Sequence, residues 1–210
     1  MGTPQTRHSY AGQSVPERRA ERRALFIDAA LTVFAARSYA KSSVTEICSA
    51  AGLSRRQFYE EYSSREDLLI AAYDAAQQAA RTAVAAAVAE HPGGSARELV
   101  SAGLTAYLHA VVTDIRRAKI AYVEIVGVSD RVEQHRLDVR DEWARTIEAI
   151  ASNIPEVHAP ACGWPTAMAG FIGALNGAAH HWSMDEHRPP VGALVDMLST
   201  LLFALLIPDH

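Results

Sequence analysis

Apolar residues recur at three- and four-residue spacing along almost the whole chain, and no run alternates between apolar and polar residues as a half-buried strand does. This pattern predicts an all-α fold of nine helices in two domains. Serine, glycine and proline residues mark where the helices begin and end. The helices are expected at about 17–37, 44–51, 55–61, 64–90, 95–113, 115–126, 129–152, 165–185 and 190–207.

The predicted helices divide between a small head and a larger body. Residues 17–63 are expected to form a three-helix head, and residues 64–210 a six-helix body. The long helix that begins at Ser64 would reach roughly 40 Å, far more than the head requires, so it is expected to lead into the body. Residues 1–16 are polar, contain Gly and Pro, and lack apolar periodicity, which predicts a flexible arm.

Residues 43–61 have the pattern of two short helices joined by a tight turn. Ser43 and Ser54 are each followed three residues later by Glu or Gln, the spacing of a capping box, in which two side chains satisfy backbone N–H groups at a helix start. Gly52 stands where the first of these helices must end, because glycine adopts the left-handed conformation at little steric cost. A helix-turn-helix of this kind can place a recognition helix in the DNA major groove.

The net charge of −4 is unevenly distributed along the chain. Residues 1–65 carry ten Lys/Arg against six Asp/Glu, whereas residues 66–210 carry ten against eighteen. A basic head on an acidic body suits a nucleic-acid-binding domain that is joined to a part that does not bind nucleic acid.

Other features of the sequence favour a cytoplasmic protein with no membrane partner. The first residues lack the apolar core of a signal peptide. The apolar run over 191–207 is short and is interrupted by Asp196, which favours a buried helix over a membrane span. Cys48 and Cys162 are far apart in sequence and suit a reducing compartment better than a disulfide framework.

The two C-terminal helices have apolar faces broader than one core needs, which favours a homodimer formed through them. The alternative is that both faces are buried inside one subunit. Small residues that would allow close helix–helix approach recur at Gly170, Gly173, Ala174, Gly177 and Ala178.

Residues 39–69, YAKSSVTEICSAAGLSRRQFYEEYSSREDLL, resemble the DNA-binding motif of TetR-family transcriptional regulators. The resemblance implies binding to double-stranded DNA at a palindromic operator. It also implies a phosphate contact for Ser43, a backbone contact for Tyr59 and a phosphate contact for Arg65, which replaces the family's usual lysine. The first turn of the recognition helix would face base edges, and it contains Ser54, Arg55, Arg56 and Gln57.

This segment also departs from the family pattern. Small residues are common in the family where this chain has Arg56 and Gln57, and Gln57 could instead be used in its capping box. Glu60 and Glu61 would repel phosphates unless they point away or pair with Arg56 or Arg65. Basic residues at the start of the first helix could offset that repulsion, and they are Arg18, Arg19, Arg22 and Arg23.

The resemblance further implies a pocket for a small-molecule effector in the body. Glu124, Trp143, Trp164 and Asn176 each have a structural alternative, such as a hydrogen bond between helices, a place in the core or a place in the dimer interface. The spacing of His180, His181 and His187 lacks the paired ligands of a helical metal site, so no metal is expected. The candidate ligand-binding residues are Tyr73, Tyr107, Tyr122, Glu124, Trp143, Trp164, Phe171, Asn176 and His180.

The sequence therefore predicts a dimeric repressor that a small hydrophobic or amphipathic effector releases from its operator. No catalytic residues and no cofactor are expected, because nucleophile elbows, phosphate-binding glycine loops and paired catalytic carboxylates do not appear in the sequence. The alternatives are an all-helical enzyme and a DNA-binding protein that responds to no ligand.

Overall fold

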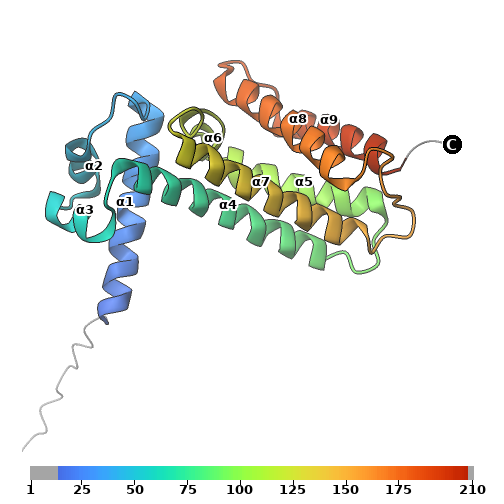
Figure 1. The fold of residues 1–210 in the computed structure, drawn as a ribbon, viewed down its shortest axis with the longest axis horizontal. Coiled ribbons are helices and arrows are strands. Elements are labelled where there is room, and N and C mark those ends of the chain that lie inside the picture. The colour runs from blue at the N-terminus through green and yellow to red at the C-terminus, as the bar shows by residue number, and fades with distance from the viewer. Residues whose placement is uncertain (1–13, 208–210) are drawn as a thin grey trace, which may run out of the picture.

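The computed structural model describes residues 14–207, and over that range the chain forms nine α-helices, one π-helical turn and no strand (Figure 1). This confirms the predicted all-α fold with its helical head and body. Residues 1–13 of the predicted arm lie outside the described range. The head consists of α1 (Val15–Arg37), α2 (Val44–Ala51) and α3 (Arg55–Glu61). The body consists of α4 (Arg65–Ala89), α5 (Ala96–Val112), α6 (Ile115–Lys119), η1 (Ile120–Glu124), α7 (Asp130–Ala151), α8 (Trp164–Met184) and α9 (Val191–Leu206).

Serine caps determine where most of these helices begin. Ser14, Ser54 and Ser95 each complete a capping box, and the box at Ser14 starts α1 two residues earlier than predicted. At Ser43 only half of the predicted box forms. The hydroxyl accepts the N–H of Glu46, but the Glu46 carboxylate binds that hydroxyl and Arg37 instead of the Ser43 N–H.

An aromatic cluster holds the head together. Phe26 of α1 meets the Phe58 ring edge-on at 5.5 Å and the Tyr62 ring at 6.1 Å. Phe26 and Phe58 are completely buried, and such edge-to-face pairs add to the free energy gained from burial. Gly52 ends α2 with φ of 65°, so the chain turns at once into α3, as predicted. The recognition helix is thereby fixed against α1.

The body is a layered helical bundle in which α4, α5 and α7 run alongside one another, with α8 and α9 together along one side (Figure 1). The long helix α4 leaves the head and packs along α5, as the pattern beyond Ser64 predicts. None of the helices within residues 14–207 is long and apolar enough to cross a membrane.

The helix predicted over 115–126 is not uniform. After α6 the chain widens into the π-helical turn η1, in which the N–H of Ile125 bonds the carbonyl of Ile120. A π-turn accommodates an extra residue in a helix and is frequent at functional sites. Here it lies between the bundle and the head.

This segment makes several polar contacts to α1 and the loop after it. The backbone N–H of Tyr39 donates to the Glu124 carboxylate at 2.7 Å, and Lys119 Nζ donates to the Ala35 carbonyl at 3.1 Å. The α6 and η1 segment therefore joins the two domains.

Asp67 provides a test of the junction between the head and the body. Hydrogen bonds from Ser63 and from Arg131 of α7 lower its pKa from 3.8 to about 2. A carboxyl whose pKa is lower in the folded protein than in the unfolded one stabilises the fold above its unfolded pKa, and this contribution is lost as pH falls towards the folded pKa. Asp67→Asn should reduce the free energy of unfolding at pH 7 by about 1 kcal/mol, because the ion pair is partly solvated.

Urea denaturation of the wild type and of Asp67→Asn at pH 7 and pH 3 measures this effect. The difference between the two proteins should shrink at the lower pH. Asp141→Asn is the control, because Asp141 is an exposed carboxylate of α7 without an ion pair among the described residues. An equal loss for Asp67→Asn at both pH values would contradict the assignment.

Candidate nucleic-acid interface and ligand cavity

Helix α3 buries one face against α1 and presents the other to solvent. Phe58 points into the head core, whereas Arg55, Arg56 and Tyr59 are exposed. Tyr59 keeps 52% of its surface accessible even though its ring touches that of Phe58. The exposed side chains combine hydrogen-bond donors with a phenol, which suits contacts to base edges and phosphates.

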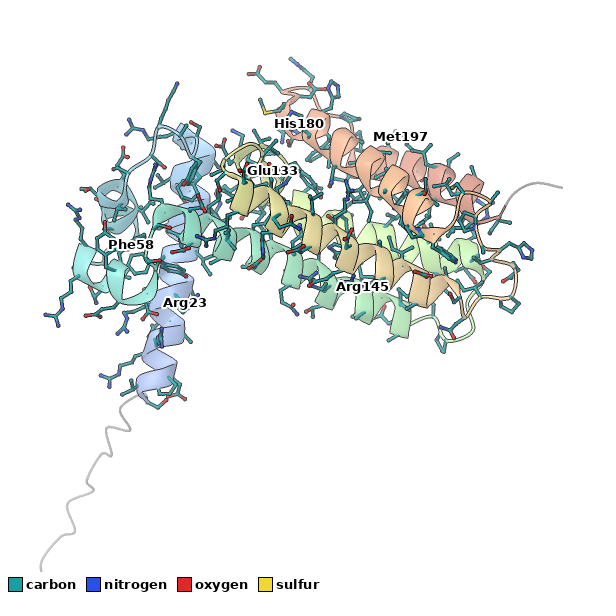
Figure 2. The ribbon with its side chains drawn as sticks, in the orientation of Figure 1. Arg23, Phe58, Glu133, Arg145, His180 and Met197 are labelled. Carbon is teal, nitrogen blue, oxygen red and sulfur yellow. The ribbon has the colours of Figure 1, made fainter. Side chains whose placement is uncertain are left out.

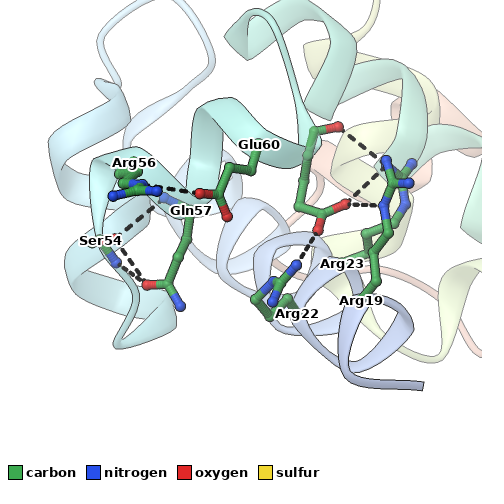
Figure 3. Close-up of polar contacts among 8 residues, drawn as sticks. Arg19, Arg22, Arg23, Ser54, Arg56, Gln57 and Glu60 are labelled. Atoms are coloured by element: carbon green, nitrogen blue, oxygen red, sulfur yellow. Dashed lines mark hydrogen bonds and ion pairs between the residues drawn. The ribbon is translucent and has the colours of Figure 1, made fainter. Parts of the chain in front are cut away.

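Gln57 is part of the capping box that starts α3 (Figure 3). Its Oε1 accepts the backbone N–H of Ser54 at 2.9 Å and the hydroxyl of Ser54 at the same distance. Of the two roles considered for Gln57, the structure shows the capping one. The amide oxygen that would accept a hydrogen bond from adenine is occupied in this arrangement.

Glu61, the last residue of α3, is held by three arginines of α1 (Figure 3). Its side chain is only 1% exposed, and its carboxylate accepts Arg19 Nε at 2.9 Å and Arg22 Nη2 at 2.8 Å. Arg23 donates to the Glu61 backbone carbonyl at 3.1 Å. Burial would raise the pKa of Glu61, but the hydrogen bonds from Arg22 and Arg19 outweigh it, so the pKa is lowered.

The acidic pair in α3 therefore does not face DNA as two free charges. Glu60 pairs with Arg56 at 3.1 Å across one helical turn, and Glu61 turns towards α1. The sequence predicts that Glu60 and Glu61 repel DNA phosphates unless they point away or pair with Arg56 or Arg65. The first pairing is present, but the partners of Glu61 are on α1 instead of at Arg65.

Arg65 is tied into the loop before α2. Its Nη1 donates to the Tyr39 carbonyl at 2.8 Å, to the Ser42 hydroxyl at 3.0 Å and to the Ser42 carbonyl, and its guanidinium lies over the Tyr39 ring. The Ser43 hydroxyl is likewise engaged by Glu46. Phosphate contacts of Ser43 and Arg65 stay predictions, and for Arg65 they would use its remaining nitrogens.

The body encloses a cavity of about 310 Å³ between α4, α5, α7, α8 and α9. Its wall is predominantly aliphatic, with side chains such as Val84, Leu99, Leu104, Ile147 and Leu202. Volume and lining are those of a site for a small apolar or amphipathic molecule.

Five of the nine predicted ligand residues line this cavity, and they are Tyr73, Tyr107, Trp143, Phe171 and Asn176. The other four do not line it, and they are Tyr122, Glu124, Trp164 and His180.

Each of these four has another place. The Tyr122 hydroxyl donates to the Tyr107 hydroxyl at 3.1 Å from outside the cavity wall, and His180 Nδ1 lies 2.7 Å from the Tyr122 carbonyl. Glu124 makes the interdomain hydrogen bond described above, which is the structural alternative considered for it. Trp164 lines a separate groove of about 240 Å³ between α7 and α8.

The uncharged polar residues that line the cavity are Tyr73, Gln77, Tyr107, Trp143 and Asn176, and two of them bond each other. Trp143 Nε1 donates to Gln77 Oε1 at 2.8 Å. Burial raises the pKa of the Tyr73 and Tyr107 hydroxyls, so both are protonated at neutral pH.

The charged groups of the cavity wall all come from α7, and the sequence reasoning missed them. Glu133, Arg136 and Arg140 recur at three- and four-residue spacing together with Leu137, so they share one helix face. That spacing was visible in the sequence, but a charged helix face is usually solvated.

No group of three or more His, Cys, Asp and Glu side chains within residues 14–207 is arranged to hold a metal ion.

Comparison with known proteins finds a family match for the head and similar folds for most of the chain. Residues 26–72 match the family model described as bacterial regulatory proteins, tetR family. Among curated proteins, none matches the sequence.

Several solved structures share the fold. FadR from Bacillus subtilis in complex with stearoyl-CoA has a TM-score of 0.73 at 19% identity, covering 89% of this chain and 99% of that one. FadR from Bacillus halodurans has a TM-score of 0.71 at 18% identity, with coverage of 91% and 96%. A tetR-family regulatory protein from Rhodococcus RHA1 has a TM-score of 0.66 at 21% identity, with coverage of 90% and 99%. The head therefore carries the DNA-binding sequence of the tetR family of bacterial regulatory proteins, and the chain along most of its length shares the fold of these solved structures.

Proposed function

We propose that this protein is a cytoplasmic, homodimeric repressor that binds a palindromic operator and is released from it by an amphipathic effector with a long apolar chain. The observation that carries the proposal is the combination of an exposed recognition helix with a partly open aliphatic cavity in the same chain. In this proposal the cavity binds its ligand and does not catalyse a reaction.

The proposed DNA contacts begin at the exposed face of α3. Arginine can bond guanine N7 and O6 in a bidentate manner, so Arg55 and Arg56 are the proposed base-reading residues. Tyr59 is the proposed backbone contact because its phenol extends from the exposed side of α3. Two heads would read half-sites about one helical turn apart.

The proposed dimer uses the outer faces of α8 and α9. Gly173 and Gly177 of α8 are exposed, and a Cβ added at either would meet no atom within 4 Å. Met197 and Leu201 of α9 are also exposed, at 43% and 41%. Small residues and uncovered apolar side chains on adjacent helices suit a four-helix interface with a second copy.

The proposed effector class follows from the cavity lining. Aliphatic side chains dominate a wall that extends across five helices, which fits a long apolar chain better than a compact polar metabolite. The structurally similar FadR from Bacillus subtilis was solved in complex with stearoyl-CoA. A fatty acyl compound is therefore the proposed effector.

The proposed release couples the cavity to the head through η1. Ala121 of η1 lines the cavity, and Glu124 of the same turn binds the backbone of Tyr39 in the head. A ligand that favours another position of this turn would shift the equilibrium between head spacings.

Two substitutions in α3 test the DNA contacts. Arg56→Ala should change the preferred base at one position of each half-site by about 1–3 kcal/mol of discrimination, because a bidentate contact is lost. Tyr59→Phe should weaken binding to all sites alike, because a phosphate contact carries no sequence information. Fluorescence anisotropy on operators selected from a random DNA pool measures both effects.

Arg97→Ala, an exposed arginine of α5, serves as the control and should leave DNA binding unchanged. The reverse pattern for Arg56 and Tyr59 would contradict the assigned roles. Failure of the folded wild type to select any operator would contradict the proposed repressor function.

A charged substitution in α8 tests the dimer. Gly177 is exposed and an added Cβ there would meet no atom within 4 Å, so Gly177→Arg is compatible with the isolated subunit, but it would bury a charge between two copies. The variant should be monomeric by light scattering and should lose at least about tenfold in operator affinity. Ala85→Arg, on the exposed side of α4, is the matched control. A dimeric Gly177→Arg protein would place the interface elsewhere.

A filled cavity tests the effector site. A Cβ at Gly103 of α5 would meet Val84 Cγ1 at 3.9 Å, an ordinary contact, so Gly103→Phe can place its ring in the cavity. The variant should bind its operator normally but require at least about tenfold more stearoyl-CoA or stearate for release. Release at the wild-type concentration would contradict binding in this cavity.

A further inference from the structure

We infer that Arg140 makes the cavity selective for effectors with an anionic group at the end of the apolar chain. The inference rests on the proposed function, and it identifies the chemistry of the ligand's polar end and the residue that recognises it.

The charges of the cavity wall lie along a single stripe of α7. Figure 2 shows Glu133 towards the head end of this helix and Arg145 further along it, so Arg140 lies between them. The remaining wall is apolar or carries uncharged polar groups, such as Gln77, Trp143 and Asn176. Any recognition of charge in this cavity must therefore come from this stripe.

Two of the three charges on the stripe cancel. The Glu133 carboxylate accepts Arg136 Nη1 at 2.6 Å and the backbone N–H of Gly127 at 2.7 Å. The hydrogen bond from Gly127 and the charge of Arg136 outweigh the effect of burial and lower the pKa of Glu133. Glu133 thus stays ionised at neutral pH, and the Glu133–Arg136 pair contributes no net charge.

Arg140 has no such partner. Within residues 14–207 no carboxylate lies at ion-pair distance from it, although its side chain is partly buried. Arg140 borders both the cavity and the groove between α7 and α8, so this residue lies where the two hollows approach one another. A partly buried cation without a counter-charge attracts an anion more strongly than a solvated one does.

The groove between α7 and α8 is also lined by carboxylates, but none of them lies at ion-pair distance from Arg140. Its other charged lining residues are Asp141, Arg145 and Glu148, and Asp141 is exposed to solvent. Leu137, 43% exposed, lies on the same face of α7 one turn before Arg140 and extends the apolar wall to the rim. A ligand with its apolar chain inside the cavity and its carboxylate or phosphate at Arg140 matches both the apolar wall and the unpaired guanidinium.

A matched pair of ligands tests the inference. Dodecanoate and dodecanol share their chain and differ in charge, and isothermal titration calorimetry gives the affinity of each. The wild type should bind dodecanoate at least about tenfold more tightly than dodecanol, since only the anion pairs with Arg140. In Arg140→Met, which keeps the aliphatic bulk, the preference should disappear through loss of dodecanoate affinity alone. Arg140→Lys should retain part of the preference.

Arg145→Met is the control variant, because Arg145 lies on the same helix but does not line the cavity. It should keep the wild-type preference. Lauroyl-CoA, compared with dodecanoate on the same proteins, distinguishes the two sources of negative charge. Tighter binding of dodecanoate assigns Arg140 to a carboxylate, and tighter binding of lauroyl-CoA that Arg140→Met abolishes assigns it to a phosphate.

Equal affinity of the wild type for dodecanoate and dodecanol would overturn the inference while leaving the apolar cavity as the effector site. A preference for dodecanoate that survives in Arg140→Met would also overturn it. Binding of none of these ligands to the folded wild type would contradict the proposed effector class together with the inference.

Discussion

The recognition helix depends on one buried carboxylate. A charge removed from water must be paired, and Glu61 satisfies this requirement with the side chains of Arg19 and Arg22, while Arg23 secures its backbone carbonyl. Because these contacts connect the C-terminal end of α3 to α1, the helix cannot rotate without leaving a charge unpaired. The exposed positions of Arg56 and Tyr59 follow from this constraint. The same pairing uses part of the positive charge of α1 inside the protein.

The same requirement, that buried polar and charged groups be paired, also bears on the cavity in the body. Two of its interior polar groups, Trp143 and Gln77, bond each other, so they make little demand on a ligand. Charge is confined to the stripe of α7, where one ion pair is complete and Arg140 is left at the border. In such a cavity the aliphatic interior supplies the binding free energy, whereas the unpaired cation at the edge determines which ligands are preferred.

The helices were predictable because serine caps and glycine stops are local signals, and the short helices of the head begin and end where the sequence indicated. The arginine partners of Glu61 were not predictable, since they are about forty residues away and depend on how α1 packs across α3. The aromatic and polar cavity residues Tyr73 and Trp143 were found by composition. The aliphatic wall and Arg140 were missed, because neither an aliphatic residue nor a charged helix face differs in sequence from an ordinary core or surface. The extra residue in η1 likewise leaves no local signal.

Arg116 of α6 bonds the side chains of Asp28 and Thr32 in α1, but two other hydrogen bonds from α6 and η1 engage only the backbone of the head, which has an evolutionary consequence. Glu124 accepts the backbone N–H of Tyr39, and Lys119 donates to the backbone carbonyl of Ala35, so both address the main chain and ignore the identity of the residues they touch. Mutations that rewrite the reading surface of α3 leave these bonds available. Under the proposed function, the bases read by α3 can therefore diverge by point mutation while these main-chain contacts between head and body stay in place.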